Sequence, residues 1–213
     1  MDFQISASQR ELMAATEKLC RQLLPLAQEA HAEDTPEALN RLRSEMAKNG
    51  LLGLNLPTEY GGLNMPLLDT LLLLQTVQSV DSTMGGLTHR TSTGAVGAVL
   101  EIGNEAQKRT FVGGVARGEI GISIGITEPE AGSAATAMKT RARVEGDEVV
   151  VNGQKIFISA ARDNHATLLY CRFGTTGRAS DIGALLLPHD APGLTISKGT
   201  VNMAGTYALI QKP

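Results

Sequence analysis

The sequence of 213 residues is poor in aromatic residues and cysteine and has no run of basic residues. Aromatic residues make up 3% of the chain and the net charge is −3, which argues against a nucleic-acid-binding protein. The two cysteines, Cys20 and Cys171, lie far apart and form no C-x-x-C motif. We expect them to be reduced thiols in a reducing compartment. The four histidines are scattered, so no metal-binding motif is evident.

A long hydrophobic run is also missing. Residues 1–4 have neither the basic nor the apolar region of a signal peptide. The most apolar stretch, residues 67–80, contains Asp69, Gln75 and Gln78 and is shorter than the roughly 20 apolar residues of a membrane span. We therefore expect no membrane span and a soluble, cytoplasmic protein. With 42% hydrophobic residues, the chain is long enough for one large or two small domains with a core.

Helical signals dominate the first half of the chain. The capping-box patterns Ser6-x-x-Gln9 and Ser8-x-x-Glu11 predict that a helix begins here. Thr35-Pro36 resembles an N-cap followed by proline in the first turn, and Gly50 is placed to end that second helix. Further helices are predicted over residues 67–80, 88–102 and 104–117.

Strand signals replace them in the second half. The turn pairs Gly146-Asp147 and Asn152-Gly153 separate short β-prone runs, and Asn-Gly is a strong hairpin signal. The sequence thus predicts an α+β protein, with an all-α domain over residues 1–118 and a small antiparallel β domain over residues 119–213. The predicted strands are 140–144, 148–151, 154–158, 167–173, 182–187 and one that begins at 194–196.

The most informative stretch joins the two halves. Three isoleucines alternate with small or hydroxyl residues over Ile122–Thr127, which predicts a strand with one buried face. Pro129 ends the strand because it has no N–H to donate. Ala131-Gly132-Ser133 then forms a loop of small residues whose backbone a ligand could approach closely. A strand of this kind running into such a loop suits a flat cofactor with polar edges.

Several segments, in order, resemble the acyl-CoA dehydrogenase family. The resemblance covers about residues 5 to 203, nearly the whole chain, and implies an N-terminal helical domain followed by a small antiparallel β-barrel domain. The segments that carry it are Gly50–Leu54 with Pro57–Gly62, Gly103–Lys108, the signature Thr127-Glu128-Pro129-x-Ala131-Gly132-Ser133, and the N-G-x-K segment Asn152–Ser159.

Membership of this family implies a flavoprotein that uses FAD. Negative charge builds at the flavin N1 and O2 during hydride transfer, and hydrogen-bond donors stabilise it. Thr127 and the neighbouring backbone would donate, Phe157 would pack on the ring, Ser159 would bind its polar edge and Ser133 would contact the acyl thioester. The cofactor-binding residues expected from the resemblance are Ile124, Gly125, Ile126, Thr127, Ser133, Phe157, Ile158 and Ser159.

Each of these residues also has a plainer interpretation. Thr127 would simply end a strand, Phe157 would belong to the core, and Glu128 and Glu130 would be solvated loop carboxylates. No residue is assigned as a catalytic base. The sequence also departs from the family pattern in two places. Ala134 stands where the family has Asp after the signature Ser, and residues 204–213 do not follow the family's sequence pattern.

The leading functional hypothesis is an FAD-dependent oxidoreductase that carries out α,β-dehydrogenation of an acyl thioester, bound to CoA or to a carrier protein, as in fatty acid metabolism. The family's C-terminal helical domain, which holds the catalytic Glu, has no counterpart here, so we expect a truncated member. The expected partners are an electron-transfer protein and further copies or a partner supplying the helices. The alternatives are a flavin-dependent monooxygenase on the same fold and a non-catalytic domain that only binds a partner.

Overall fold

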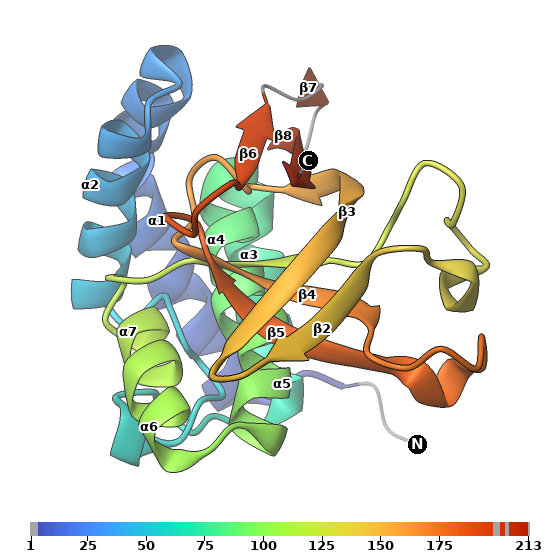
Figure 1. Cartoon of the computed structure of the whole chain (residues 1–213). Coiled ribbons are helices and arrows are strands. Elements are labelled where there is room, and N and C mark those ends of the chain that lie inside the picture. The colour runs from blue at the N-terminus through green and yellow to red at the C-terminus, as the bar shows by residue number, and fades with distance from the viewer. Residues whose placement is uncertain (1–3, 198–200, 203–204, 213) are drawn as a thin grey trace. The chain divides into compact units, whose positions relative to one another are not determined.

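The computed structural model describes residues 4–197, 201–202 and 205–212, the last two ranges as strand backbone. The chain forms two compact units, Met1–Gly121 and Ile122–Pro213, here called the helical unit and the β unit (Figure 1). Among the described residues, no helix combines the length and apolar character that a bilayer crossing requires.

The helical unit is built from helices of very different length (Figure 1). A 3₁₀ turn at Thr58–Tyr60 precedes α3, and a π-helical turn at Lys108–Val112 separates α6 from α7. The helices are α1 (Ala7–Glu33), α2 (Pro36–Lys48), α3 (Leu67–Val80), α4 (Ser82–Ser92), α5 (Ala95–Ile102), α6 (Glu105–Gln107) and α7 (Gly113–Ala116).

Local capping signals place the first two helices where the sequence predicts them. Ser6 Oγ accepts from the Gln9 amide at 3.1 Å, and the Gln9 side chain accepts from the Ser6 amide at 2.9 Å, which completes a capping box. Thr35 caps α2 through the Ala38 amide at 3.2 Å. Gly50 follows α2 with a φ of 68°, a conformation that glycine adopts readily. These starts and stops are confirmed.

The later helices differ from the prediction. In place of one helix over 88–102, α4 begins at Ser82 and α5 at Ala95. The Asp81 carboxylate caps α4 by accepting from the Met84 amide at 2.9 Å, an interaction that the apolar pattern does not reveal. Gly94 separates the two helices, and a Cβ at Gly94 would lie 2.7 Å from a backbone oxygen of α4.

The β unit contains one mixed sheet. Its strands follow the order β1-β4-β2-β3-β8-β6, with β5 paired to β4 and β7 paired to β8. The strands are β1 (Ile122–Gly125), β2 (Arg141–Glu145), β3 (Glu148–Ser159), β4 (Ala166–Arg172), β5 (Ile182–Pro188), β6 (Thr195–Ser197), β7 (Val201–Asn202) and β8 (Gly205–Lys212). Of the divergent residues 204–213, Ala204 and Pro213 lie outside the described residues.

The α+β fold class is confirmed, but the sheet is not purely antiparallel. β1 pairs in parallel with β4, in the register Ile122↔Ala166 to Gly125↔Leu169, and β2 meets β4 in parallel at Arg141↔Arg172. The remaining pairs are antiparallel. The β2–β3 hairpin lies between β1 and β4 in sequence. β3 runs opposite to β2, and β4 runs again in the direction of β1 and β2, which makes its pairing with both of them parallel.

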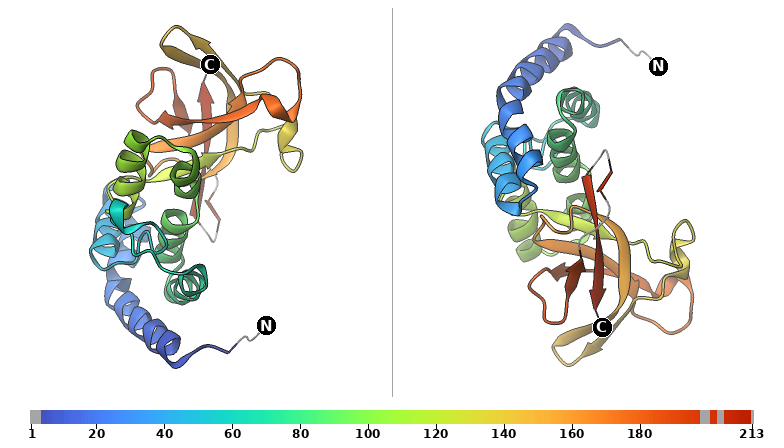
Figure 2. Two further views of the ribbon diagram at one scale, coloured as in Figure 1. Left: turned by 90° about the horizontal axis from the view of Figure 1, so that it is seen from below. Right: turned by 90° about the horizontal axis from the view of Figure 1, so that it is seen from above.

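The predicted hairpin turn at Asn152-Gly153 is wrong. β3 runs through both residues, and the turn lies at Gly146-Asp147 instead. Gly153 brings the strand very close to β2, since a Cβ there would lie 2.3 Å from Thr140 Oγ1. Figure 2 shows β3 bending along its length, and its register with β8 shifts between Lys155 and Ile158.

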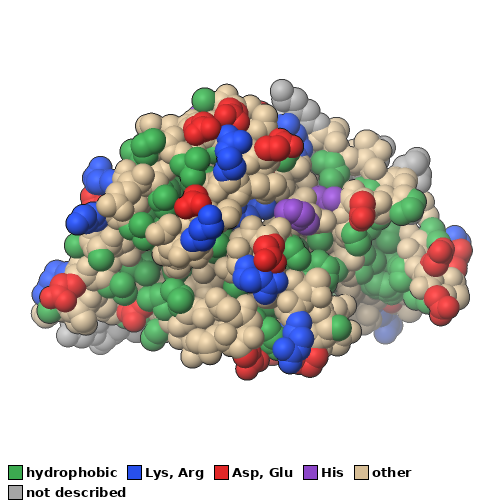
Figure 3. Space-filling view, turned by 90° about the vertical axis from the view of Figure 1, so that its left-hand side faces the viewer, with side chains coloured by type: hydrophobic (Ala, Val, Ile, Leu, Met, Phe, Trp, Pro, Cys, Tyr) green, Lys and Arg blue, Asp and Glu red, His purple; other side chains and the backbone are tan. Residues whose placement is uncertain are grey.

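Each unit has its own buried apolar cluster. In the helical unit the cluster includes Leu42, Met46 and Val77, and in the β unit it includes Val151 and Leu169. Both cysteines are buried free thiols, one in each unit, and burial raises the pKa of each to about 11. The face seen in Figure 3 shows acidic and basic side chains interspersed.

Candidate functional site

The β unit brings two of the predicted binding segments side by side. The Ile156 amide donates to the Thr127 carbonyl at 2.9 Å, and Ser123 Oγ donates to the Ser159 carbonyl at 2.9 Å. The end of β1 therefore runs alongside the last residues of β3, in the opposite direction. Residues 124–127 and 157–159, which are about 30 residues apart in sequence, thus form one continuous edge, here called the candidate edge.

The predicted alternation of buried and exposed residues in β1 holds only in part. Ile122 is buried as predicted, but Ser123 and Gly125 are buried as well, and Ile124 is 40% exposed. Two contacts explain the burial of the small residues: Asn164 Nδ2 donates to Ser123 Oγ at 2.9 Å, and Gly125 lies so close to the Thr167 side chain that a Cβ would meet it at 2.9 Å. An apolar side chain is thereby left on the solvent side of the candidate edge.

Phe157 supplies the second exposed apolar group. Its side chain is 63% exposed, so the interpretation of Phe157 as a core residue is wrong. The residue has a φ of 57° and lies within the irregular stretch of β3, where a bulge redirects side chains. A bulky residue in this conformation is strained, and such strain is concentrated at functional sites. Its neighbour Ile158 is only 2% exposed and pairs with Ala208 of β8, so its side chain is not available to a ligand.

The segment between β1 and β2, residues 126–140, contains the Thr-Glu-Pro signature and is here called the signature loop. It begins with a tight turn. The Glu128 amide donates to the Ala131 carbonyl at 3.1 Å, and the Ala131 amide donates to the Glu128 carbonyl at 3.2 Å. Ser133 follows in an exposed stretch, and Glu130 is exposed, as predicted. The role of Ser133 beside a cofactor or substrate stays a prediction.

Glu128 is not the solvated carboxylate that its loop position suggests. It is 5% exposed and pairs with Lys155, which is 1% exposed, at 2.8 Å. Burial alone would raise the pKa of Glu128, but the hydrogen bonds from the Lys139 amide, Lys155 and Thr140 together lower it. Burial lowers the pKa of Lys155, against the opposing effect of Glu128.

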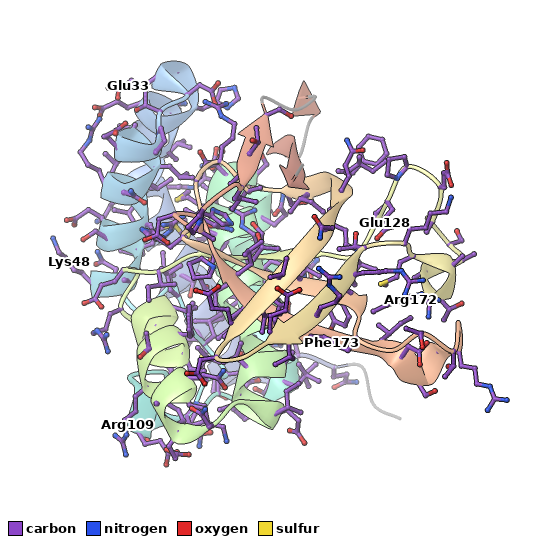
Figure 4. The ribbon with its side chains drawn as sticks, in the orientation of Figure 1. Glu33, Lys48, Arg109, Glu128, Arg172 and Phe173 are labelled. Atoms are coloured by element: carbon purple, nitrogen blue, oxygen red, sulfur yellow. The ribbon has the colours of Figure 1, made fainter. Side chains whose placement is uncertain are left out.

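A second buried charge holds the far end of the signature loop. Arg172 is 7% exposed and donates to the carbonyls of Met138 (2.8 Å), Thr136 and Arg178 (2.9 Å). Asp181 lies 3.8 Å from it, and the pKa of this carboxyl is lowered chiefly by a hydrogen bond from the Thr176 hydroxyl. Figure 4 shows Glu128 and Arg172 beside the loop that follows β1.

Sequence reasoning missed both Lys155 and Arg172. A signal for Lys155 exists, since it continues the inward side of β3 two residues after Gly153 and four after Val151. A lysine at an inward position is almost never fully buried unless it is paired. The identity of its partner is not visible in the sequence, because Glu128 lies 27 residues away.

Two carbonyls of the candidate edge are engaged within the β unit. The Thr127 carbonyl accepts from the Ile156 amide and the Ile126 carbonyl accepts from Lys155 Nζ at 2.8 Å. The Ser159 side chain on the same edge is exposed. An exposed hydroxyl residue beside an exposed aromatic ring suits a flat ligand with electron-rich atoms along one side. Among the described residues, no three His, Cys, Asp or Glu side chains are grouped to hold a metal ion.

Residues 6–119 match the family described as acyl-CoA dehydrogenase, N-terminal domain, and residues 123–209 match acyl-CoA dehydrogenase, middle domain. The chain belongs to the acyl-CoA dehydrogenase family. Two family models in the expected order account for the two units, and the motif resemblance is confirmed.

Relatives within the family share the same region. A 3-sulfinopropanoyl-CoA desulfinase of Paraburkholderia xenovorans is 31% identical over 200 residues, which are 92% of this chain and 50% of the relative. The probable acyl-CoA dehydrogenase YngJ of Bacillus subtilis is 32% identical, over 92% of this chain and 52% of its own. The ChsE4-ChsE5 complex from Mycobacterium tuberculosis matches with a TM-score of 0.87 at 25% identity, over 100% of this chain and 54% of that one. The chain thus spans about half the length of the relatives that it matches.

Proposed function

We propose that the candidate edge binds the flavin of FAD and that the chain is the N-terminal and middle part of an FAD-dependent oxidoreductase acting on an acyl-CoA thioester. The observation that carries the proposal is the pairing of exposed Phe157 and Ile124 with a backbone whose carbonyls at 126 and 127 are engaged elsewhere. The relatives support the substrate class, since one is a 3-sulfinopropanoyl-CoA desulfinase and another a probable acyl-CoA dehydrogenase.

The residues present fit an isoalloxazine ring. When bound, FAD supplies the hydride acceptor for oxidation of the acyl thioester. Phe157 offers a face for the ring to pack against, and the Thr127 and Ser159 hydroxyls lie on the same edge as donors for its electron-rich side. Because the Ile126 and Thr127 carbonyls are turned away, the edge presents no lone pairs from these groups that would repel the developing charge.

The electron acceptor and the assembly follow from the same chemistry. Each turnover leaves two electrons on the cofactor, so we propose an electron-transfer protein as the partner that removes them. We also propose that the chain associates with copies of itself or with a partner. The ChsE4-ChsE5 structure supports this by example, since it is a complex of ChsE4 with ChsE5.

Titration of the purified chain with FAD tests the proposal. We expect the visible flavin bands to shift and flavin fluorescence to change on binding. Phe157→Ala should weaken binding about tenfold, the value of a lost stacking contact of about 1.4 kcal/mol. Phe173→Ala is the matched control, because Phe173 is also an exposed phenylalanine of the β unit, 43% exposed, and lies outside the candidate edge.

The outcomes separate the hypotheses. A chain that takes up no FAD contradicts both flavoenzyme functions and favours a domain that only binds a partner. If FAD binds, anaerobic bleaching of the flavin by an acyl-CoA supports the dehydrogenase. Reduced flavin that instead consumes oxygen with incorporation into a substrate supports the monooxygenase.

A further inference from the structure

The buried Lys155–Glu128 pair joins the two strands of the candidate edge. Lys155 Nζ reaches three groups of the segment after β1: the Ile126 carbonyl at 2.8 Å, the Glu128 carboxylate at 2.8 Å and Met138 Sδ at 3.8 Å. The same carboxylate accepts from the amides of Lys139 (2.6 Å) and Thr140 (2.9 Å). One side chain of β3 thus holds the beginning and the end of the signature loop.

Gly125 of β1 lies beside the lysine side chain. A Cβ at Gly125 would make an ordinary contact of 3.6 Å with Lys155 Cγ, whereas it would lie 2.9 Å from the Thr167 side chain and 3.1 Å from the Leu169 side chain. The close packing of β1 on β4 therefore requires the glycine, and the lysine side chain runs next to it on the way to the Ile126 carbonyl.

A buried ion pair of this kind does not stabilise a fold better than apolar residues of similar volume would. Such pairs are best explained by the conformation they impose. Here the imposed conformation is specific: the Ile126 carbonyl is turned inward, and the tight turn from Glu128 to Ala131 is closed above it. An unheld carbonyl at 126 would be free to rotate to the ligand side and present a lone pair where a donor is needed.

We infer that Lys155 is a positioning residue, which acts through the Ile126 carbonyl and the Glu128 carboxylate to keep that carbonyl turned inward and the turn from Glu128 to Ala131 closed. The expected effect of Lys155 on FAD binding rests on the proposed flavin site. The expected effect of Lys155 on the backbone conformation does not. The lysine of the N-G-x-K segment and the glutamate of the Thr-Glu-Pro signature each have a role, although neither contacts the cofactor in this scheme.

The test compares two paired double variants of the full chain. Lys155→Met alone leaves a buried carboxylate without its counter-charge and endangers folding. Lys155→Met with Glu128→Gln removes both charges, and the single Gln amide oxygen still accepts from one of the two backbone amides, Lys139 or Thr140, that the two carboxylate oxygens bind. The matched control is Lys139→Met with Glu130→Gln, because that Lys–Glu pair braces the same loop but is 72% and 69% exposed.

We expect the buried double variant to melt close to the unmodified chain and yet to bind FAD about tenfold more weakly, in line with the effect of other outer-shell positioning residues. Its flavin absorption bands should resemble those of free FAD. The exposed double variant should retain the affinity and the bands. A buried double variant with unchanged affinity and bands overturns the inference, because a purely structural pair would be rescued by removing both charges.

Hydrogen exchange of the chain without FAD separates this inference from the proposed function. The amides of Ala131 and Ile156 should exchange at least tenfold faster in the buried double variant, since their acceptors lie in the segment that Lys155 holds. Unchanged exchange overturns the inference even where FAD binds. Faster exchange in a chain that takes up no FAD supports the structural role and contradicts the flavin site.

Discussion

Phe157 combines an unfavourable backbone with an exposed ring. Its φ of 57° costs a residue with a Cβ about 1–2 kcal/mol, and its side chain recovers little of this by burial. Phe157→Gly should therefore be about 1 kcal/mol more stable than Phe157→Ala in urea unfolding of the chain without ligand, although both lose the ring. Val150, on the same strand and without a positive φ, is the control and should show the opposite order. A more stable alanine variant at 157 would contradict the strain.

His189 gives the β unit a pH dependence at the residue scale. Its ring nitrogen Nε2 lies 2.8 Å from Thr167 Oγ1, and burial lowers its pKa below the ordinary 6.5, although a hydrogen bond that the ring donates to the backbone of Asn164 acts in the raising direction. The unfolded chain therefore takes up the proton first as the pH falls. Stability should decline as the pH drops from about 6.5 towards the lowered pKa and level off below it.

Urea midpoints measured between pH 7.5 and 5 check this slope. His189→Gln should remove the slope, because glutamine does not titrate. His31→Gln, at an exposed position of the helical unit, should leave it in place. A slope that survives in His189→Gln would assign it to another group.

At the scale of elements, α1 contains a proline in its interior. Pro25 is exposed and cannot donate to the carbonyl of Arg21, so it costs the helix up to about 3 kcal/mol, partly offset by the stiffer unfolded chain. Pro25→Ala should raise the unfolding free energy of the helical unit by about 1–2 kcal/mol, measured by circular dichroism in urea. Pro36→Ala is the control, since Pro36 occupies the first turn of α2, where proline is tolerated, and should give no gain.

Elements specified by near neighbours could be predicted, and those specified by distant ones could not. The predicted helix over residues 67–80 is α3, and the Ser6 capping box needs only residues three apart. Asn152-Gly153 failed as a turn because the strand continues past Thr140, the residue before β2. The burial of Ser123 in β1 was not predicted because its partner Asn164 lies 41 residues away.

The candidate site follows the same division. The family resemblance named Thr127, Phe157 and Ser159, and the structure places them on one edge. Local pattern predicted neither the exposure of Phe157 nor the burial of Glu128, because both depend on how β3 bends and on where Lys155 lies. Sequence motifs therefore indicate which segments meet, whereas the pairing of charges beneath them requires the fold.

At the scale of the whole molecule, the two units each bury an apolar cluster of their own, and we therefore expect them to unfold as two cooperative units. Leu42 is fully buried in the helical unit, and Leu169 is 3% exposed in the β unit. Truncating either leucine to alanine should lower stability by about 2–5 kcal/mol, through lost transfer free energy and the cavity left behind. Native-state hydrogen exchange resolves where the loss falls, because local opening reports the stability of each cooperative unit.

Leu42→Ala should speed the exchange of protected amides in α1 to α4 and leave β4 and β5 unchanged, and Leu169→Ala should do the reverse. Equal acceleration in both units by either variant would mean that they unfold as one cooperative body. If each variant changes amide exchange in its own unit only, a substitution that stabilises the helical unit, such as Pro25→Ala, should leave amide exchange at the candidate edge of the β unit unchanged. Binding-site variants in the β unit could then be compared with a shared helical background, and a change in FAD affinity could be attributed to the edge itself.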